Sequence, residues 1–217
     1  MKRHRLLAIV ELVALIGIFL ADRYLPISKT LYFFTLGWIS LRLRGLRWRD
    51  VGLARPRSWL VAIAVGLLAG LAMEGLELFV TQPLLIRLTG QKPDFSDFFV
   101  LHGNAKMLLL GLALTWSLAA FGEEMVWRGY LVNRLAGLLG STRRVAWVVS
   151  LIAVNAAFGL AHRYQGVTGI IDEALMGIIL GLIYLASGRN LTAAIVAHGV
   201  ADSVDAFLFF IGHYPGT

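Results

Sequence analysis

The chain of 217 residues has no cysteine and little charge. Without cysteine it can form no disulfide framework and no thiolate metal site, and it has no cysteine nucleophile. Charged residues make up 15% of the chain, whereas about 25% is usual in soluble domains. Hydrophobic residues make up 58%, and the mean hydropathy is +0.74. A soluble domain of this size cannot bury so much apolar surface, and disordered chains have the opposite balance, so the composition indicates a membrane protein.

Apolar stretches recur along the whole chain, and a membrane-spanning helix needs about 20 mostly apolar residues. Seven candidates are 5–22, 27–41, 59–81, 107–136, 145–164, 167–186 and 191–211. The first has basic residues before it but no small-residue cleavage site after it, so we expect a retained helix rather than a signal peptide. The sequence therefore predicts an all-α fold, a polytopic integral membrane helical bundle of about seven transmembrane helices, forming a single membrane domain over 1–217.

The 20 lysines and arginines are distributed unevenly between the two sides of this bundle. With a cytoplasmic N-terminus, the inside group is Lys2, Arg3, Arg5, Arg42, Arg44, Arg47, Arg49, Arg55, Arg57, Arg128, Arg134, Arg143, Arg144 and Arg189. The outside group is smaller: Arg23, Lys29, Arg87, Lys92, Lys106 and Arg163. The positive-inside rule then predicts a cytoplasmic N-terminus, and we expect the membrane to be the bacterial inner (plasma) membrane. Because the basic residues lie in short loops between spans, the net charge of +7 does not indicate a nucleic-acid partner.

Six of these arginines fall between residues 42 and 57, with apolar residues between them. We interpret the segment as a positive-inside anchor, with which an amphipathic segment lying on anionic lipid is compatible. A patch that docks a substrate is the alternative.

Charged side chains within the spans cost about 2.5–3.5 kcal/mol each at the bilayer centre, so each calls for a reason. The first and third spans contain Glu11, Glu74 and Glu77. The last four contain Glu123, Glu124, Arg128, His162, Asp172, Glu173, His198, Asp202 and Asp205. The second group is three times larger and has helical spacings, so the functional site is expected there.

The first motif is Glu123-Glu124-x-x-x-Arg128. Glu124 and Arg128 are four residues apart and can pair along one helix face. Glu123 points about 100° away and needs a different partner. We expect Arg128 to neutralise Glu124, which leaves Glu123 free to act as a general base. A buried ion pair that only fixes helix packing is the alternative for Glu124 and Arg128.

The second motif places Asn155, Phe158 and His162 on one helix face. A short connection around residue 140 predicts an antiparallel hairpin with the preceding helix. At about 1.5 Å per residue, Glu123 and His162 then lie at similar depths, roughly 26 and 32 Å from the turn. We therefore expect these two side chains to meet.

The third motif is His198-x-x-x-Asp202, with Asp205 on the same stripe. Asp202 can orient the imidazole and select its tautomer. His198 lies only about 15 Å from the loop at 187–190, so meeting Glu123 requires a projecting hairpin or strongly tilted helices.

Between these motifs, the pair Gly177 and Gly181 predicts close approach of a neighbouring helix. Asp172 and Glu173 either line a cavity or lie near the outer headgroups, and their role stays open.

Carboxylates and histidines gathered in this way suit the activation of water for attack on a carbonyl group. The same inventory is compatible with Zn²⁺, held by Glu123, His162 and His198 with one open position. We favour a metal-free glutamate base and no cofactor, because no closely spaced histidine pair presets a metal site. Sequence patterns for zinc proteases of the H-E-x-x-H type, serine hydrolases and phosphate-binding loops are absent.

Together and in this order, the three motifs resemble those of the CPBP family, which holds CAAX prenyl proteases and bacteriocin-processing (Abi) proteins. The resemblance covers 105–212 as a catalytic core, and leaves 1–104 as N-terminal helices and a basic cytoplasmic loop. It implies a protease similar to type II CAAX prenyl endopeptidases, acting on a membrane-associated or prenylated peptide in a lipid environment. It also implies roles for the motif residues: Glu123 and His162 activating water, Glu124 and Arg128 supporting Glu123, and His198 and Asp202 stabilising the oxyanion.

One position departs from the pattern of the CAAX enzymes, which typically have asparagine where this chain has Asp202. An ionised aspartate cannot donate to an oxyanion, so Asp202 either orients His198 or donates only when protonated. Family names also include metalloprotease, so Zn²⁺ stays open. A non-catalytic membrane immunity or scaffolding protein on the same fold is the alternative function.

Overall fold

The computed structural model describes residues 2–21 and 24–215, and side chains from residue 6 onward. Arg23 therefore lies outside the described residues, as do the side chains of the basic residues that open the first helix. Throughout the described ranges the regular structure is helical, so the predicted all-α fold is confirmed.

The helices follow the predicted stretches closely. The N-terminal half contains α1 (Lys2–Ala21), α2 (Lys29–Leu43), η2 (Trp48–Val51), α3 (Trp59–Leu76), η3 (Glu77–Thr81), α4 (Gln82–Thr89) and η4 (Ser96–Leu101). The C-terminal half contains α5 (Ala105–Leu114), η5 (Thr115–Glu123), η6 (Met125–Val132), α6 (Asn133–Leu139), α7 (Arg144–Ala161), η7 (Arg163–Gln165), α8 (Gly166–Ala186) and α9 (Thr192–Ile211).

Five continuous helical stretches are long and apolar enough to cross a membrane, which supports the predicted polytopic bundle. They are Trp59–Thr89, Ala105–Leu139, Arg144–Ala161, Arg163–Ala186 and Thr192–Ile211. The other two predicted spans are helical as well, and of these α2 falls short of that length. The apolar part of the first helix is Leu6–Ala21, and α2 has 15 residues.

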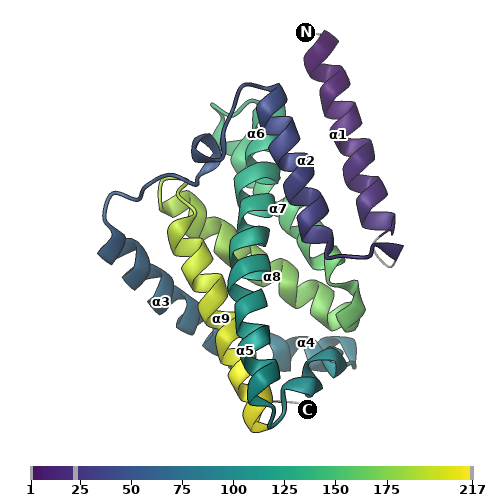
Figure 1. Cartoon of the computed structure of the whole chain (residues 1–217), viewed down its shortest axis with the longest axis vertical. Coiled ribbons are helices and arrows are strands. Elements are labelled where there is room, and N and C mark those ends of the chain that lie inside the picture. Colours follow the sequence, from purple (N-terminus) through teal and green to yellow (C-terminus); the bar gives the residue numbers. More distant parts are fainter. Residues whose placement is uncertain (1, 22–23, 216–217) are drawn as a thin grey trace.

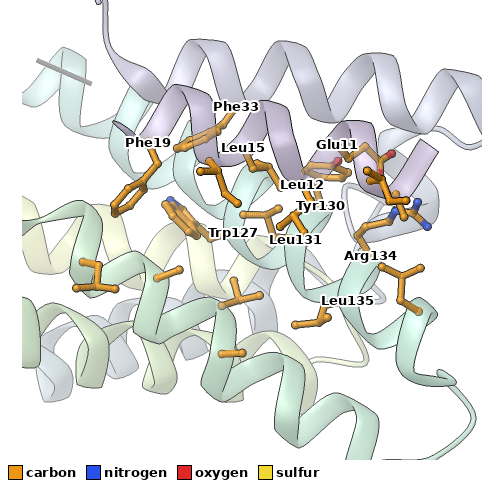
Figure 2. A pocket seen from close by; sticks show the side chains of 18 of the residues that line it. Glu11, Leu12, Leu15, Phe19, Phe33, Trp127, Tyr130, Leu131, Arg134 and Leu135 are labelled. Atoms are coloured by element: carbon orange, nitrogen blue, oxygen red, sulfur yellow. The ribbon is translucent and has the colours of Figure 1, made fainter. Parts of the chain in front are cut away.

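The long helix from α5 to α6 runs through the molecule from one end to the other (Figure 1). Of the other helices, α3 packs along α9 and α7 packs along α8. α1 lies at the edge and packs mainly on α2. Between α1, η6 and α7 is an apolar cavity of about 570 Å³, with Glu11 and Arg134 at one end (Figure 2). Glu11 accepts hydrogen bonds from Ser40 and from Arg134 Nε, the latter at 2.6 Å, so the carboxylate in the first helix is paired.

The predicted span over 107–136 lies within the continuous helical stretch Ala105–Leu139, but this stretch is not α-helical throughout. Two π-helical segments, η5 and η6, interrupt it, and they meet at Glu124. In a π-helix the backbone bonds run from residue i to i+5, and such segments are rare and frequent at functional sites. The two motif glutamates therefore lie where the helix geometry is irregular.

The predicted close approach at Gly177 and Gly181 is confirmed, because α7 crosses α8 at these glycines. A Cβ atom on Gly181 would lie 2.1 Å from Leu151 Cδ1, and one on Gly177 would lie 2.7 Å from Asn155 Oδ1. Neither contact leaves room for a larger side chain.

The basic segment between α2 and α3 contains the short helix η2. The segment is held by hydrogen bonds to α8 and to the connection between α8 and α9. Tyr184 Oη donates to Val51 O at 3.1 Å, and Leu191 N donates to Gly52 O at 3.0 Å. Its arginines are therefore fixed at one end of the bundle.

Candidate active site

The first motif forms an ion pair that the protein encloses completely. Arg128 Nη1 donates to Glu124 Oε1 at 2.7 Å, and both side chains are 0% exposed. Arg128 Nη2 donates to Asn155 Oδ1 at 3.1 Å and to Gly177 O at 2.8 Å. The guanidinium carbon also lies 4.8 Å from the centre of the Phe158 ring. Arg128 thus ties η6 to α7 and α8, which explains why the second motif carries Asn155 and Phe158.

His198 lies against the same glutamate. Its Nδ1 is 3.0 Å from Glu124 Oε1, and its Nε2 is 3.6 Å from Asp202 Oδ2. The ring is 6% exposed. The imidazole is therefore held between two carboxylates, and Glu124 fixes its orientation. The family resemblance implied that Glu124 supports Glu123, whereas in the structure Glu124 contacts Arg128 and His198.

Glu123 is separate from this buried cluster. Its side chain is partly exposed and lines a cavity of about 550 Å³. Thr30 Oγ1, from the start of α2, donates to Glu123 Oε1 at a long 3.4 Å. The carboxylate is thus held by one weak hydrogen bond and faces open space.

His162 caps the C-terminal end of α7, where the helix turns into η7. Its Nδ1 lies 3.0 Å from Phe158 O. Since a carbonyl oxygen only accepts, this contact makes Nδ1 the donor and leaves Nε2 with a lone pair in the neutral ring. The ring also lies edge-on to Phe158, 4.7 Å between centres.

The cavity brings four of the six predicted site residues together. Glu123, His162, His198 and Asp202 all line it, while Glu124 and Arg128 lie buried behind His198. Of the two residues whose role was left open, Glu173 lines the cavity. Asp172 is buried and accepts a hydrogen bond from Thr81 Oγ1 at 2.8 Å.

A catalytic Zn²⁺ site needs three converging protein ligands. Within the described ranges, no three histidine, aspartate or glutamate side chains converge in a way that could hold a metal ion. Glu123, His162 and His198 line one cavity without forming a ligand set, and His198 Nδ1 is engaged by Glu124. The arrangement therefore does not fit the alternative metal site.

Residues 105–204, from the start of α5 into α9, match the family model described as type II CAAX prenyl endopeptidase Rce1-like. This segment belongs to the Rce1-like family. The match contains all three motifs and confirms the resemblance to the CAAX proteases of the CPBP family. No curated protein and no solved structure gives a significant match. The match supports a CAAX-type intramembrane endopeptidase at family level, with a lipid environment and a peptide substrate in general terms.

Part of the cavity comes from outside the Rce1-like segment, and sequence reasoning missed it. Thr30 reaches Glu123 from α2, although the first 104 residues had no expected part in the site.

Two residues inside the matched segment were missed as well. Tyr164 and Gln165 line the cavity just after His162. No sequence motif marks Gln165 as a site residue. Its place in the site is known only from the structure, where its Nε2 donates to Glu173 Oε1 at 3.0 Å.

Proposed function

We propose that this protein is an intramembrane endopeptidase that hydrolyses a peptide bond of a membrane-associated or lipid-modified peptide with a water molecule activated by Glu123. One observation carries the proposal: Glu123, His162 and His198 line one cavity, with a fully buried ion pair behind them. The Rce1-like family supports the reaction class.

Glu123 takes the role of general base. Its carboxylate accepts a proton from water as the oxygen attacks the peptide carbonyl carbon, and the same proton is passed to the leaving amine when the C–N bond breaks. The lone pair on His162 Nε2 accepts a hydrogen bond from the same water and aligns it. Glu123 suits this role because its carboxylate is held only weakly, by the long hydrogen bond from Thr30 Oγ1.

His198 takes the role of oxyanion donor. Its Nδ1 donates to Glu124, so Nε2 is the nitrogen available to the cavity. In the imidazolium form, Nε2–H donates to the negative oxygen that develops on the attacked carbonyl. Asp202 orients this ring and balances its charge, which resolves the departure from the asparagine of the CAAX enzymes without requiring a protonated aspartate.

The test is a cleavage assay on a panel of membrane-associated peptides, with the purified protein in detergent. We expect hydrolysis with a pH–rate profile set by a carboxylate and a histidine, and no loss of rate with a strong chelator. Loss of activity with the chelator, together with its restoration by Zn²⁺, would contradict the metal-free mechanism and leave the same residues in the site.

We also propose that the N-terminus is cytoplasmic, in a bacterial inner (plasma) membrane. The basic loop at 42–58 and the connection at 136–144 then lie inside. The cavity is lined in part by η4, by η7 and by Ser28 in the connection between α1 and α2, none of which belongs to these two inside segments.

Cysteine labelling tests this orientation directly, because the chain has no cysteine of its own. Ser141 and Ser96 are both exposed, the first in the predicted inside connection and the second in η4. In intact cells, we expect an impermeant thiol reagent to label Ser96→Cys and to spare Ser141→Cys until the membrane is opened. The reverse pattern would refute the proposed topology.

A further inference from the structure

The apolar cavity beside α1 is separate from the candidate active site. None of the described residues lines both cavities. Figure 2 shows that Phe19, Phe33 and Trp127 lie at one end of this cavity, while Glu11 and Arg134 lie at the other. The cavity of about 570 Å³ therefore has an apolar end and a charged end, and the proposed reaction uses neither.

One face of α1 forms a continuous apolar wall of this cavity. The wall is made by a helical stripe of residues, which are Ala8, Ile9, Leu12, Leu15, Ile16, Phe19 and Leu20. From Ala8 to Leu20 it extends about 18 Å, at 1.5 Å per residue of helix. One leaflet contributes about 15 Å, or half, of the hydrocarbon core of a bilayer. The apolar wall is thus about as long as one acyl chain of a membrane lipid.

The charged end has more positive than negative charge. Arg134 Nε donates to Glu11 Oε2 at 2.6 Å, and Arg134 Nη2 has no hydrogen-bond partner among the described residues. Arg44, at the C-terminal end of α2, lies close enough for the charges of both Glu11 and Arg134 to act on it. Two arginines therefore share one carboxylate, and an anion at this end of the cavity would balance the second of them.

This charge distinguishes between the lipids that could fill the cavity. The apolar wall alone suits the acyl chain of a phospholipid and the prenyl group of a modified peptide equally well. A prenyl group has no anion beside its chain, whereas a phospholipid has a phosphate. Basic pockets between transmembrane helices bind anionic headgroups in this way. Arg44 and Arg134 thus favour the phospholipid.

We propose that the cavity beside α1 binds one anionic phospholipid of the bilayer, with an acyl chain along α1 and the phosphate beside Arg44 and Arg134. The lipid fills the space between α1 and the helices η6 and α7, and so holds the first helix against the bundle. This site goes beyond the proposed function and does not depend on it.

The experiment measures lipid binding to the purified, delipidated protein in detergent by native mass spectrometry. The probes are phosphatidylglycerol, which is anionic, and phosphatidylcholine, which has a phosphate but no net charge. One basic residue near a membrane surface contributes about 1 kcal/mol to the binding of anionic lipid, which corresponds to about fivefold in affinity. We therefore expect the first phosphatidylglycerol to bind about fivefold more tightly than the first phosphatidylcholine.

Two variants test the contribution of charge. Arg44→Gln removes the arginine in excess and leaves the pair of Glu11 and Arg134 in place, so the two lipids should bind with nearly equal affinity. Arg55→Gln removes one charge from an exposed position of the basic loop, outside this cavity. This control should keep the preference of the wild type.

Two further variants test the cavity itself. Ala153 and Ala156 are both exposed on α7, but only Ala153 lines the cavity. In Ala153→Phe the ring takes the place of the acyl chain, so the affinity for both lipids should fall about 10-fold, equivalent to about 1.4 kcal/mol. Ala156→Phe should bind as the wild type does. Thermal melts identify a variant that has lost its fold, and Ile16→Trp, which fills the cavity from α1, then takes the place of Ala153→Phe.

The outcomes decide the inference without any measurement of cleavage. A preference for phosphatidylglycerol that disappears in Arg44→Gln, together with weaker binding in Ala153→Phe, supports it. Equal affinities in the wild type, an unchanged preference in Arg44→Gln, or unchanged binding in the variant that fills the cavity would overturn it. An uncharged prenylated peptide that binds more tightly than phosphatidylglycerol, and is lost in Ala153→Phe, would assign the cavity to a lipid-modified peptide instead.

Discussion

Replacing Glu123 with glutamine is expected to abolish peptide hydrolysis and to leave the protein folded. The amide cannot accept a proton from water, and a positioned general base contributes about 10²–10⁴-fold to the rate. Glu123 makes one long hydrogen bond, to Thr30, and is not part of the buried ion pair, so its neutral isostere leaves no charge stranded. The measurement is the cleavage rate beside a thermal melt in detergent, where the melting temperature should stay close to that of the wild type.

A matched variant controls for a general effect of charge in the cavity. Asp97 lines the same cavity and is exposed. Asp97→Asn should retain most of the activity if Glu123 acts as a base rather than as one negative charge among several. Wild-type rates in Glu123→Gln would rule out Glu123 as the base.

The features that the sequence predicted well are local ones. The pair of Glu124 and Arg128 follows from a spacing of four residues on one helix, and it forms even though π-helical segments flank Glu124. The packing at Gly177 follows from the absence of a side chain, which any neighbouring helix can use. Such features depend on one element and its immediate periodicity, so one sequence is enough to predict them.

The features that the sequence could not predict depend on how helices are placed against one another. The depth estimate let His198 meet Glu123 only if the hairpin projects or the helices tilt; in the structure His198 lines the same cavity as Glu123 and its ring contacts Glu124. The estimate assumed an even rise of 1.5 Å per residue and upright helices. The irregular segments of the long helix and the tilt of α9 depend on packing across the bundle. Neither can be predicted from the sequence motifs. For the same reason, the approach of Thr30 to Glu123 left no signal in the sequence.

Replacing Glu124 with glutamine is expected to lower stability as well as activity, in contrast to the variant of its neighbour. Arg128 has no exposed surface, and in this variant it loses the carboxylate that balances its charge. Removing one partner of a buried ion pair typically costs about 3–5 kcal/mol. His198 also loses the acceptor at its Nδ1, so the orientation of the ring is weakened. Thermal melts of wild type, Glu123→Gln and Glu124→Gln in the same detergent should place the last well below the other two.

A second substitution shows whether the stranded charge is the cause. In Glu124→Gln combined with Arg128→Met, no charge is left buried at this place, and replacing a whole buried pair by apolar groups is often neutral. The double variant should therefore melt at a higher temperature than Glu124→Gln alone, although it remains inactive because His198 is no longer held. Because Glu124 and Arg128 are in contact, their effects on the free energy of unfolding are expected to be non-additive. A double variant more stable than Glu124→Gln alone would show that the stranded charge of Arg128 causes the loss. If Glu123→Gln were the strongly destabilised variant while Glu124→Gln stayed folded and inactive, the roles assigned to the two glutamates would have to be exchanged.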